Sequence, residues 1–297
     1  MNIADKKSFS LDHVLVTPKD YMSTREQFRQ LGFSPSPISY HPWGTATCFI
    51  MFADNFIELI SVTDATKLGT GAVNGFCFGR QMDAFARRGE EGISLIALHS
   101  KDARQDFSQL SVKIPENQGV VDFRRPIILE NGQPDEVVVS MALFIDQQSP
   151  DSSWFLCQQH RPELIWQDQW RQHENGADAM LAVTYLADDP AELATGWRRL
   201  YGDQVRYDGR IAEVDTGSGL LRAIDLATAQ SEYAGVALPA AAGSQPHGIS
   251  LRLHTANLEP LIRRLDTQGV AYHRTPGRVL VTPGAAGNVI IEFVQQR

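Results

Sequence analysis

The chain of 297 residues is poor in cysteine, and none of its cysteines belongs to a CxxC pair. Cys48, Cys77 and Cys157 each have apolar neighbours in the sequence. No basic residue lies beside them to lower a thiol pKa, so a catalytic thiol is not indicated. An odd number of isolated cysteines instead predicts free, buried thiols in a reducing compartment.

Basic residues are in the minority, with 27 Lys and Arg against 35 Asp and Glu, a formal net charge of -8. This balance argues against a protein that grips a phosphate backbone or an anionic membrane. No apolar run approaches the roughly 20 residues that span a bilayer, and the first residues lack an apolar leader. We therefore expect a cytoplasmic protein with no nucleic-acid partner and no membrane partner.

Several common catalytic signatures are also missing. The chain has no GxGxxG fingerprint, no phosphate-binding loop and no GxSxG elbow. The short run Thr216-Gly217-Ser218-Gly219 falls between two expected strands and is read as a turn.

What the sequence does contain is a repeat: strand, helix, then further strands, four times. In the first copy, Ser23 is expected to cap the helix and Gly32 to end it. The expected elements are strand 11–16, helix 24–31, a weak strand 33–40, strand 47–52, a turn at 53–55 and strand 56–62.

The other three copies follow the same order with different loops. In the second copy we expect strands 92–98, 123–129, 136–145 and 153–159, helix 103–110 and a turn at 130–133. The helical pattern at 78–88 joins the first copy to the second. In the third and fourth we expect strands 180–185, 211–214, 220–226, 248–253, 278–281 and 288–293, with helices 190–200 and 258–265.

The repeat predicts an α+β fold of four βαβββ modules. One module exposes a sheet face that it cannot bury alone, whereas two modules close a concave sheet over a pocket. We expect one domain over residues 1–170, from modules 9–62 and 92–160. A second, degenerate domain is expected over 178–297, from modules 180–226 and 248–295, after a polar linker near 167–177.

Six stretches of the sequence carry a resemblance to a known family: Leu11-Asp12-His13-Val14, Leu31-Gly32-Phe33, His41-Pro42-Trp43-Gly44-Thr45, Ile57-Glu58-Leu59, the run 159–166 and the run 173–177. On these residues the chain resembles the glyoxalase-like branch of the vicinal oxygen chelate superfamily, which includes glyoxalases, bleomycin-resistance proteins and extradiol dioxygenases. The resemblance implies a single divalent metal in the sheet concavity, held by residues of the first and last strands of the modules.

Two residues in the first module are the leading metal ligands. Glu58 lies in an apolar strand, where an unpaired carboxylate is costly. His13 lies in the first strand of the same module. Together an imidazole and a carboxylate suit Zn, Fe, Mn or Ni. The alternatives are an ion pair for Glu58 and a hydrogen-bonded strand histidine for His13.

A third ligand is expected from the second module, where Leu95 stands at the position of His13. Gln158 lies near the position of Glu58 and is taken as a substrate-binding candidate, and His160 follows on the same face of that strand. We predict His160 as the third metal ligand. A hydrogen-bonded surface histidine before Pro162 is the alternative.

The run from His41 to Thr45 provides further candidates. His41 is predicted as a general acid or base, alongside Glu58, because its ordinary pKa is near neutrality. Trp43 and Thr45 are predicted to bind substrate, and Gly44 is expected to permit close approach of the backbone to a ligand. A structural turn with an aromatic cover is the alternative. His173 and Asn175 are read as a polar connector.

The second domain lacks a matching site. His13 lies 19 residues before Gly32, and the same spacing from Gly202 and Gly269 leads to Val183 and Ser250. Glu292 does match Glu58. We expect this half to be structural or partner-binding, and a homodimer stays open.

Two functions follow from this pattern. The first is a metal-dependent enzyme of the lyase, isomerase or dioxygenase type, acting on a small oxygen-bearing substrate. The second is a metal-free protein that binds or sequesters a small molecule, as bleomycin-resistance proteins do. A scaffold without chemistry is a third reading, resting on the second half alone.

Overall fold

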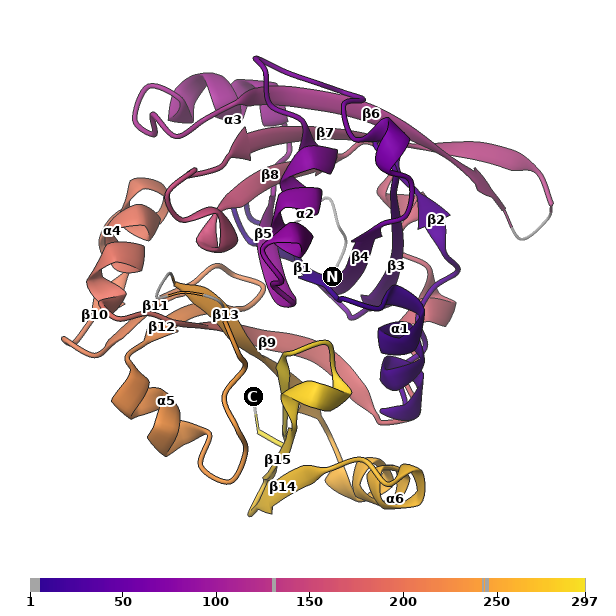
Figure 1. The fold of residues 1–297 in the computed structure, drawn as a ribbon, viewed down its shortest axis with the longest axis vertical. Helices are drawn as coiled ribbons and strands as arrows, with labels where there is room; N and C mark the ends of the chain where they lie inside the picture. Colours follow the sequence, from indigo (N-terminus) through magenta and orange to yellow (C-terminus); the bar gives the residue numbers. More distant parts are fainter. Residues whose placement is uncertain (1–5, 130–131, 242, 244–245, 297) are drawn as a thin grey trace.

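The computed structural model describes residues 6–129, 132–241, 243 and 246–296. It confirms the α+β class and the four βαβββ modules (Figure 1). Modules one and two consist of β1 (Leu11–Thr17), α1 (Tyr21–Gln30), β2 (Ser39–Tyr40), β3 (Thr45–Met51), β4 (Phe56–Val62), β5 (Gly92–His99), α3 (Ala103–Leu110), β6 (Gly119–Ile128), β7 (Pro134–Phe144) and β8 (Trp154–Gln159).

Modules three and four repeat this order in the second half of the chain. They consist of β9 (Ala177–Leu186), α4 (Pro190–Tyr201), β10 (Arg206–Tyr207), β11 (Ile211–Asp215), β12 (Leu220–Ile224), β13 (His247–Thr255), α6 (Leu258–Gln268), β14 (Tyr272–Thr275), β15 (Arg278–Val281) and β16 (Ile290–Val294).

In every module the last strand pairs with the first in parallel, as β1 does with β4, β5 with β8, β9 with β12 and β13 with β16. The modules then pair through their first strands, which run antiparallel, β1 beside β5 and β9 beside β13. Residues of first and last strands are therefore neighbours at the centre of each half. This arrangement brings together side chains that are distant in the sequence.

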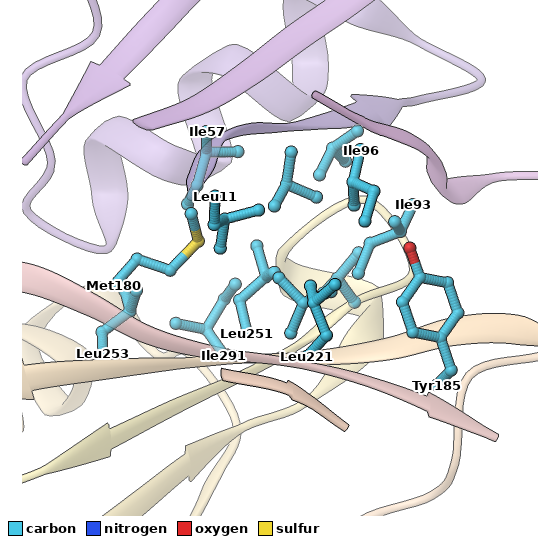
Figure 2. Packing of buried hydrophobic residues seen from close by; sticks show 14 of the residues in the cluster. Leu11, Ile57, Ile93, Ile96, Met180, Tyr185, Leu221, Leu251, Leu253 and Ile291 are labelled. Carbon is cyan, nitrogen blue, oxygen red and sulfur yellow. The ribbon is translucent and has the colours of Figure 1, made fainter. Parts of the chain in front are cut away.

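The largest apolar cluster lies between the two halves (Figure 2). Leu11, Ile57 and Ile96 reach it from the first half, and Leu221 and Leu251 from the second. The opposite face of each sheet has its own cluster, so any pocket on these faces is separated from its counterpart by the shared core.

Helices α2 (Phe78–Arg87) and α5 (Leu226–Glu232) each pack on the sheet face opposite the shared core, one in each half (Figure 1). Helix α2, close to the helix expected at 78–88, buries Phe78 and Met82 in the cluster of the first half. Helix α5 covers the second half and was not predicted. The expected strand 220–226 stops at Ile224 because Asp225 caps the helix, accepting a hydrogen bond from the Thr228 amide.

Other differences from the expected elements are local. Helix α1 begins earlier, since Asp20, rather than Ser23, is its cap and accepts from the Ser23 amide. The weak strand at 33–40 is reduced to β2, consistent with Pro35 and Pro37. The expected turn 130–133 includes residues 130 and 131, which lie outside the described residues.

The linker between modules two and three is anchored to module one. The Asn175 side chain donates to the Leu31 carbonyl at 2.9 Å. The His173 ring accepts from the Ser34 amide at Nδ1 and donates from Nε2 to the Met51 carbonyl, at 3.1 and 2.9 Å. Both residues act as structural ties, as the polar-connector reading predicts.

The junction of the two halves gives a first prediction. Gly248 of β13 pairs with Ile93 of β5, and a Cβ at Gly248 would lie 2.5 Å from the Ile93 Cβ. Gly248→Ala should lower the unfolding free energy by about 1–3 kcal/mol through overpacking. As a control, Gly196→Ala in α4, with nothing within 4 Å of the added Cβ, should raise it by about 0.4–1 kcal/mol. Urea unfolding measures both, and equal stability of Gly248→Ala and wild type would contradict the close contact.

A second prediction concerns pH. Burial lowers the pKa of His173 from 6.5 to about 4, partly opposed by its bond to Met51. The unfolded chain therefore binds more protons between these values. The contribution of His173 to stability is present above about pH 6.5 and lost as pH falls through about 4. As pH falls over this window, the urea midpoint of His173→Gln should thus decrease less steeply than that of wild type. The control His160→Gln, which changes an exposed residue, should follow wild type. Identical slopes for His173→Gln and wild type would rule out this role.

Candidate active site

The strand register places His13 and Glu58 side by side. His13 pairs with Phe56 and Leu15 with Glu58 across β1 and β4. His13 Nε2 lies 3.4 Å from Glu58 Oε2, and both side chains are buried. The Phe56 ring stacks on the imidazole with centroids 4.4 Å apart. An imidazole nitrogen and a carboxylate oxygen, both of which can ligate transition metals, therefore face each other in a buried site.

A β-bulge in β1 fixes how His13 is presented. Leu11 pairs with Leu98 but His13 pairs with Ala97, so Asp12 is an additional residue in the strand. Asp12 Oδ1 lies 2.8 Å from His13 Nδ1. Asp12 thereby engages one ring nitrogen and leaves Nε2 for Glu58, the arrangement that orients histidine ligands of metals.

Asp12 is itself held by cations and donors. Its carboxylate accepts from Lys6 Nζ at 3.3 Å and from Gln159 Nε2 at 3.1 Å. Burial opposes its ionisation, but Lys6, His13 and His99 hold its pKa well below the ordinary value. An ionised Asp12 keeps the proton of His13 on Nδ1.

His13 and Glu58 each shift the pKa of the other toward its charged form. Burial alone would lower the pKa of His13, but its bonds to Asp12 and Glu58 raise it to about 9. Burial alone would raise the pKa of Glu58, but His13, His41 and Thr47 lower it to about 2. Thr47 Oγ1 donates to Glu58 Oε1 at 2.6 Å. Glu58 is therefore an anion whose orientation is fixed by its neighbours.

His41 approaches the same carboxylate from the turn before β3. Its Nε2 lies 3.9 Å from Glu58 Oε1, and its Nδ1 lies 3.0 Å from Thr45 Oγ1. It stacks on Trp43 at 5.0 Å. Burial lowers the pKa of His41 to about 4, despite the field of Glu58, so the imidazole is neutral at physiological pH.

The turn that carries His41 depends on Gly44. Gly44 has φ +86°, and a Cβ there would lie 2.1 Å from the Asp64 carbonyl oxygen. The close approach that Gly44 makes is to the chain's own backbone, whereas the expected approach to a ligand stays a prediction. This turn positions His41 beside Glu58 and Trp43 against His41, and Thr45 contacts the site through His41.

These groups line a small internal pocket of about 40 Å³. Its walls are mostly aromatic, with Phe49, Phe56, Phe78, Phe123 and Phe155 among them. Three lining atoms are buried without a hydrogen-bond partner: Arg125 Nε, Trp43 Nε1 and Gln159 Oε1. Buried polar groups are almost always satisfied, so this concentration in one pocket is what a missing ligand would leave.

The second module contributes walls rather than ligands. Leu95 stands at the position of His13, as expected, and the pairing of Ala97 with Phe155 repeats that of Leu15 with Glu58. The counterpart of Glu58 is therefore Phe155 and not Gln158. Side chains alternate along β8, so the pocket is reached by Cys157 and Gln159.

Gln158 and His160 consequently point away from the pocket. The Gln158 side chain accepts from the Ala103 backbone amide at 3.0 Å and donates to the Lys101 carbonyl at 2.8 Å, beside α3. His160 is exposed, and its Nε2 lies 2.9 Å from Ser140 Oγ. The two residues do share a face, but it is the face opposite Glu58, so neither is brought to the predicted site.

Asp12, His13 and Cys157 form a second group of potential ligands, with one ligand atom of each within 4.8 Å of the others. Asp12 already accepts from Lys6 and Gln159 in addition to His13. Burial raises the pKa of the Cys157 thiol well above its ordinary value, which opposes the thiolate a metal requires. His13 Nε2 and Glu58 are the better pair of donors.

The second half has different residues and partners at the same positions. Ser250 pairs with Ile290, so it occupies the position of His13, as the glycine spacing predicts. Glu292 occupies the position of Glu58 but accepts from Arg252 and Arg278 at 2.9 and 2.6 Å. The Tyr233 hydroxyl, which follows α5, lies 2.6 Å from Ser250 Oγ. Glu292 and Ser250 thus have partners from within this half.

None of the described helices is long and apolar enough to cross a membrane.

Comparison with known proteins supports the architecture. A family model described as a glyoxalase-like domain matches residues 11–201. A hypothetical protein from Staphylococcus aureus has a similar structure, with 14% identity, a TM-score of 0.65 and coverage of 96% of this chain and 98% of that chain. No curated protein matches.

Two further structures share the fold at low identity. A mutant of 4-hydroxymandelate synthase from Streptomyces coelicolor has 11% identity and a TM-score of 0.55, covering 97% of this chain and 92% of its own. A xylose isomerase-like TIM barrel/4-hydroxyphenylpyruvate dioxygenase fusion protein has 14% identity and a TM-score of 0.51, covering 97% of this chain and 49% of its own. Because the family model covers residues 11–201, most of the sequence, the chain belongs to the glyoxalase-like family.

Proposed function

We propose that the chain is a metal-dependent enzyme with one divalent cation held in its first half by His13 Nε2, Glu58 and His41 Nε2. The observation that carries the proposal is the buried pair of His13 and Glu58, 3.4 Å apart, with Asp12 fixing the other ring nitrogen of His13. His41 replaces His160 as the third donor, because its neutral ring faces Glu58 at 3.9 Å.

The donor set indicates the kind of metal. Two imidazole nitrogens and one carboxylate form the set used by Fe(II) oxygenases, and Zn, Mn and Ni accept the same donors. All three donors come from module one, whereas Leu95 and Phe155 occupy the matching positions of module two. Positions on the cation not taken by these three side chains are left for substrate oxygens.

The bound cation would act as a Lewis acid on vicinal oxygens of a small substrate, a chemistry common to lyase, isomerase and dioxygenase reactions. The chain's own residues then have separate tasks. Asp12 and Phe56 orient the His13 ring, and Thr47 holds Oε1 of Glu58. The aromatic walls exclude water. We assign Trp43 and Gln159 to the substrate, because each presents an unpartnered polar atom to the pocket.

The second candidate function is a metal-free binding protein. It is favoured by the apolar counterparts of the ligands in module two and by the aromatic lining. The two functions differ in their response to chelator. Quenching of Trp43 fluorescence by a bound small molecule should weaken with EDTA in an enzyme of the proposed kind and stay unchanged in a metal-free binder.

Metal affinity provides the direct test. Calorimetric titration of chelator-treated protein with Mn²⁺ or Zn²⁺ should give about one ion per chain. Because His13 and Glu58 supply the donors, His13→Ala and Glu58→Ala should each weaken binding at least about 100-fold, and His41→Ala about 10–100-fold. His160→Ala is the matched control and should bind as wild type does. A wild-type chain that binds no ion, or a His13→Ala variant with unchanged affinity, would refute the proposal.

Asp12 allows a second test, which separates the two ligand groups. If Asp12 orients His13, Asp12→Asn should weaken metal binding about 10–100-fold while Cys157→Ser leaves it unchanged. A loss in Cys157→Ser as large as that in His13→Ala would instead assign the metal to Asp12, His13 and Cys157. Circular dichroism of each variant checks that the fold is retained.

A further inference from the structure

Arg125 is a buried cation without a counter-ion. It lies on β6, is 4% exposed and makes no ion pair with any described residue. Its Nη1 donates to Ser39 Oγ, and the guanidinium lies over the Phe49 ring, 5.3 Å from the centroid. Its Nε has no hydrogen-bond partner. A guanidinium removed from water in this way is costly unless an anion accompanies it.

The neighbouring arginine shows the ordinary alternative. Arg124 is exposed, and its Nη1 is paired with Glu136 Oε2 at 2.6 Å. Side chains alternate across the strand, so Arg124 faces solvent and Arg125 faces the interior. The buried carboxylate of Glu58 acts on Arg125 only through its field and is already bonded to His13 and Thr47. The chain therefore leaves Arg125 available to an anion.

Arg125 also lies at a boundary between two spaces. Together with Phe49 it lines both the internal pocket and an adjacent cavity of about 610 Å³. The walls of this cavity are largely apolar, with Ile38, Ile127 and Trp170 among them. The internal pocket, at about 40 Å³, holds little more than an ion and a water, whereas the outer cavity is large enough for an organic molecule.

We propose that Arg125 binds the carboxylate of a small apolar or aromatic acid whose body lies in the outer cavity. The proposal rests on the proposed function, since it names the substrate class of the same site. The planar guanidinium matches a carboxylate in a two-point contact. A phosphate ester fits less well, because a dianion would meet a single guanidinium and the nearby negative charge of Glu58.

The test uses phenylacetate and its neutral analogue phenylacetamide as probes. Both are titrated calorimetrically against chelator-treated wild type, Arg125→Gln and the matched control Arg124→Gln, which loses the same charge. Phenylacetate should bind wild type and Arg124→Gln at least about tenfold more tightly than the amide, and Arg125→Gln should bind both alike. An equal affinity of wild type for acid and amide, or a preference that survives in Arg125→Gln, would overturn the proposal.

Two further measurements keep the result decisive. Arg125→Lys retains the charge but loses the planar guanidinium with its two parallel donors. Its preference for phenylacetate over phenylacetamide should therefore be smaller than that of wild type, and an undiminished preference counts against the two-point contact. If inorganic phosphate displaces phenylacetate at equal concentration, the site is a general anion site and the assigned class is wrong. The thermal midpoint of ligand-free Arg125→Gln should not fall below that of wild type, because a costly buried charge has been removed. A clear fall would show that the guanidinium is already compensated.

The outcome is separate from that of the metal proposal. Chelator-treated protein that prefers the acid, combined with a wild type that binds no Mn²⁺ or Zn²⁺, supports Arg125 as the anion site and refutes the enzyme. A wild type that binds one metal ion but shows no preference for phenylacetate over phenylacetamide supports the metal site and refutes Arg125 as the anion site.

Discussion

A carboxylate buried in the middle of a sheet must receive donors or cations, and this requirement shapes both halves of the molecule. Glu58 and Glu292 stand at the same position of their modules. Glu292 is paired with two arginines, Arg252 and Arg278. Glu58 is met by His13, His41 and Thr47, neutral or titratable groups whose lone pairs and protons can be rearranged. The same constraint is therefore met by arginine ion pairs in one half and by histidine and threonine partners in the other.

The packing of the modules keeps these two solutions independent. Because the halves share one core between their sheets, neither outer face takes part in the other's chemistry (Figure 2). Helices α2 and α5 then cover the two faces differently. Helix α2 adds apolar walls around Glu58, whereas the residue following α5, Tyr233, bonds directly to Ser250. The difference between an open site and a filled one rests on these inserted segments rather than on the strands.

Most of the fold could be predicted from the sequence because the repeat is periodic and the punctuation by Gly and Pro is clear. The pairing of His13 with Glu58 followed from the same repeat. The side chains that face the pocket could not be predicted, because a shift of one residue along a strand turns a side chain to the other face. Gln158 lies in β8 and His160 directly follows it, but side-chain alternation turns both away from the pocket, which Gln159 reaches instead. The bulge at Asp12 and the unpaired state of Arg125 arise from tertiary contacts, for which the sequence pattern contains no signal.

The concentration of donors within module one divides the work between the modules. With the donor set confined to one repeat, the facing repeat supplies Phe155, Gln159 and Arg125, which shape and charge the space opposite the donors. Under the proposed function, changes in the second repeat alter which molecule is accepted without disturbing these donors, and changes in the first repeat alter the metal without redesigning the cavity. Such a chain can diversify one half of its pocket at a time, a freedom that a centre with ligands from both repeats does not have.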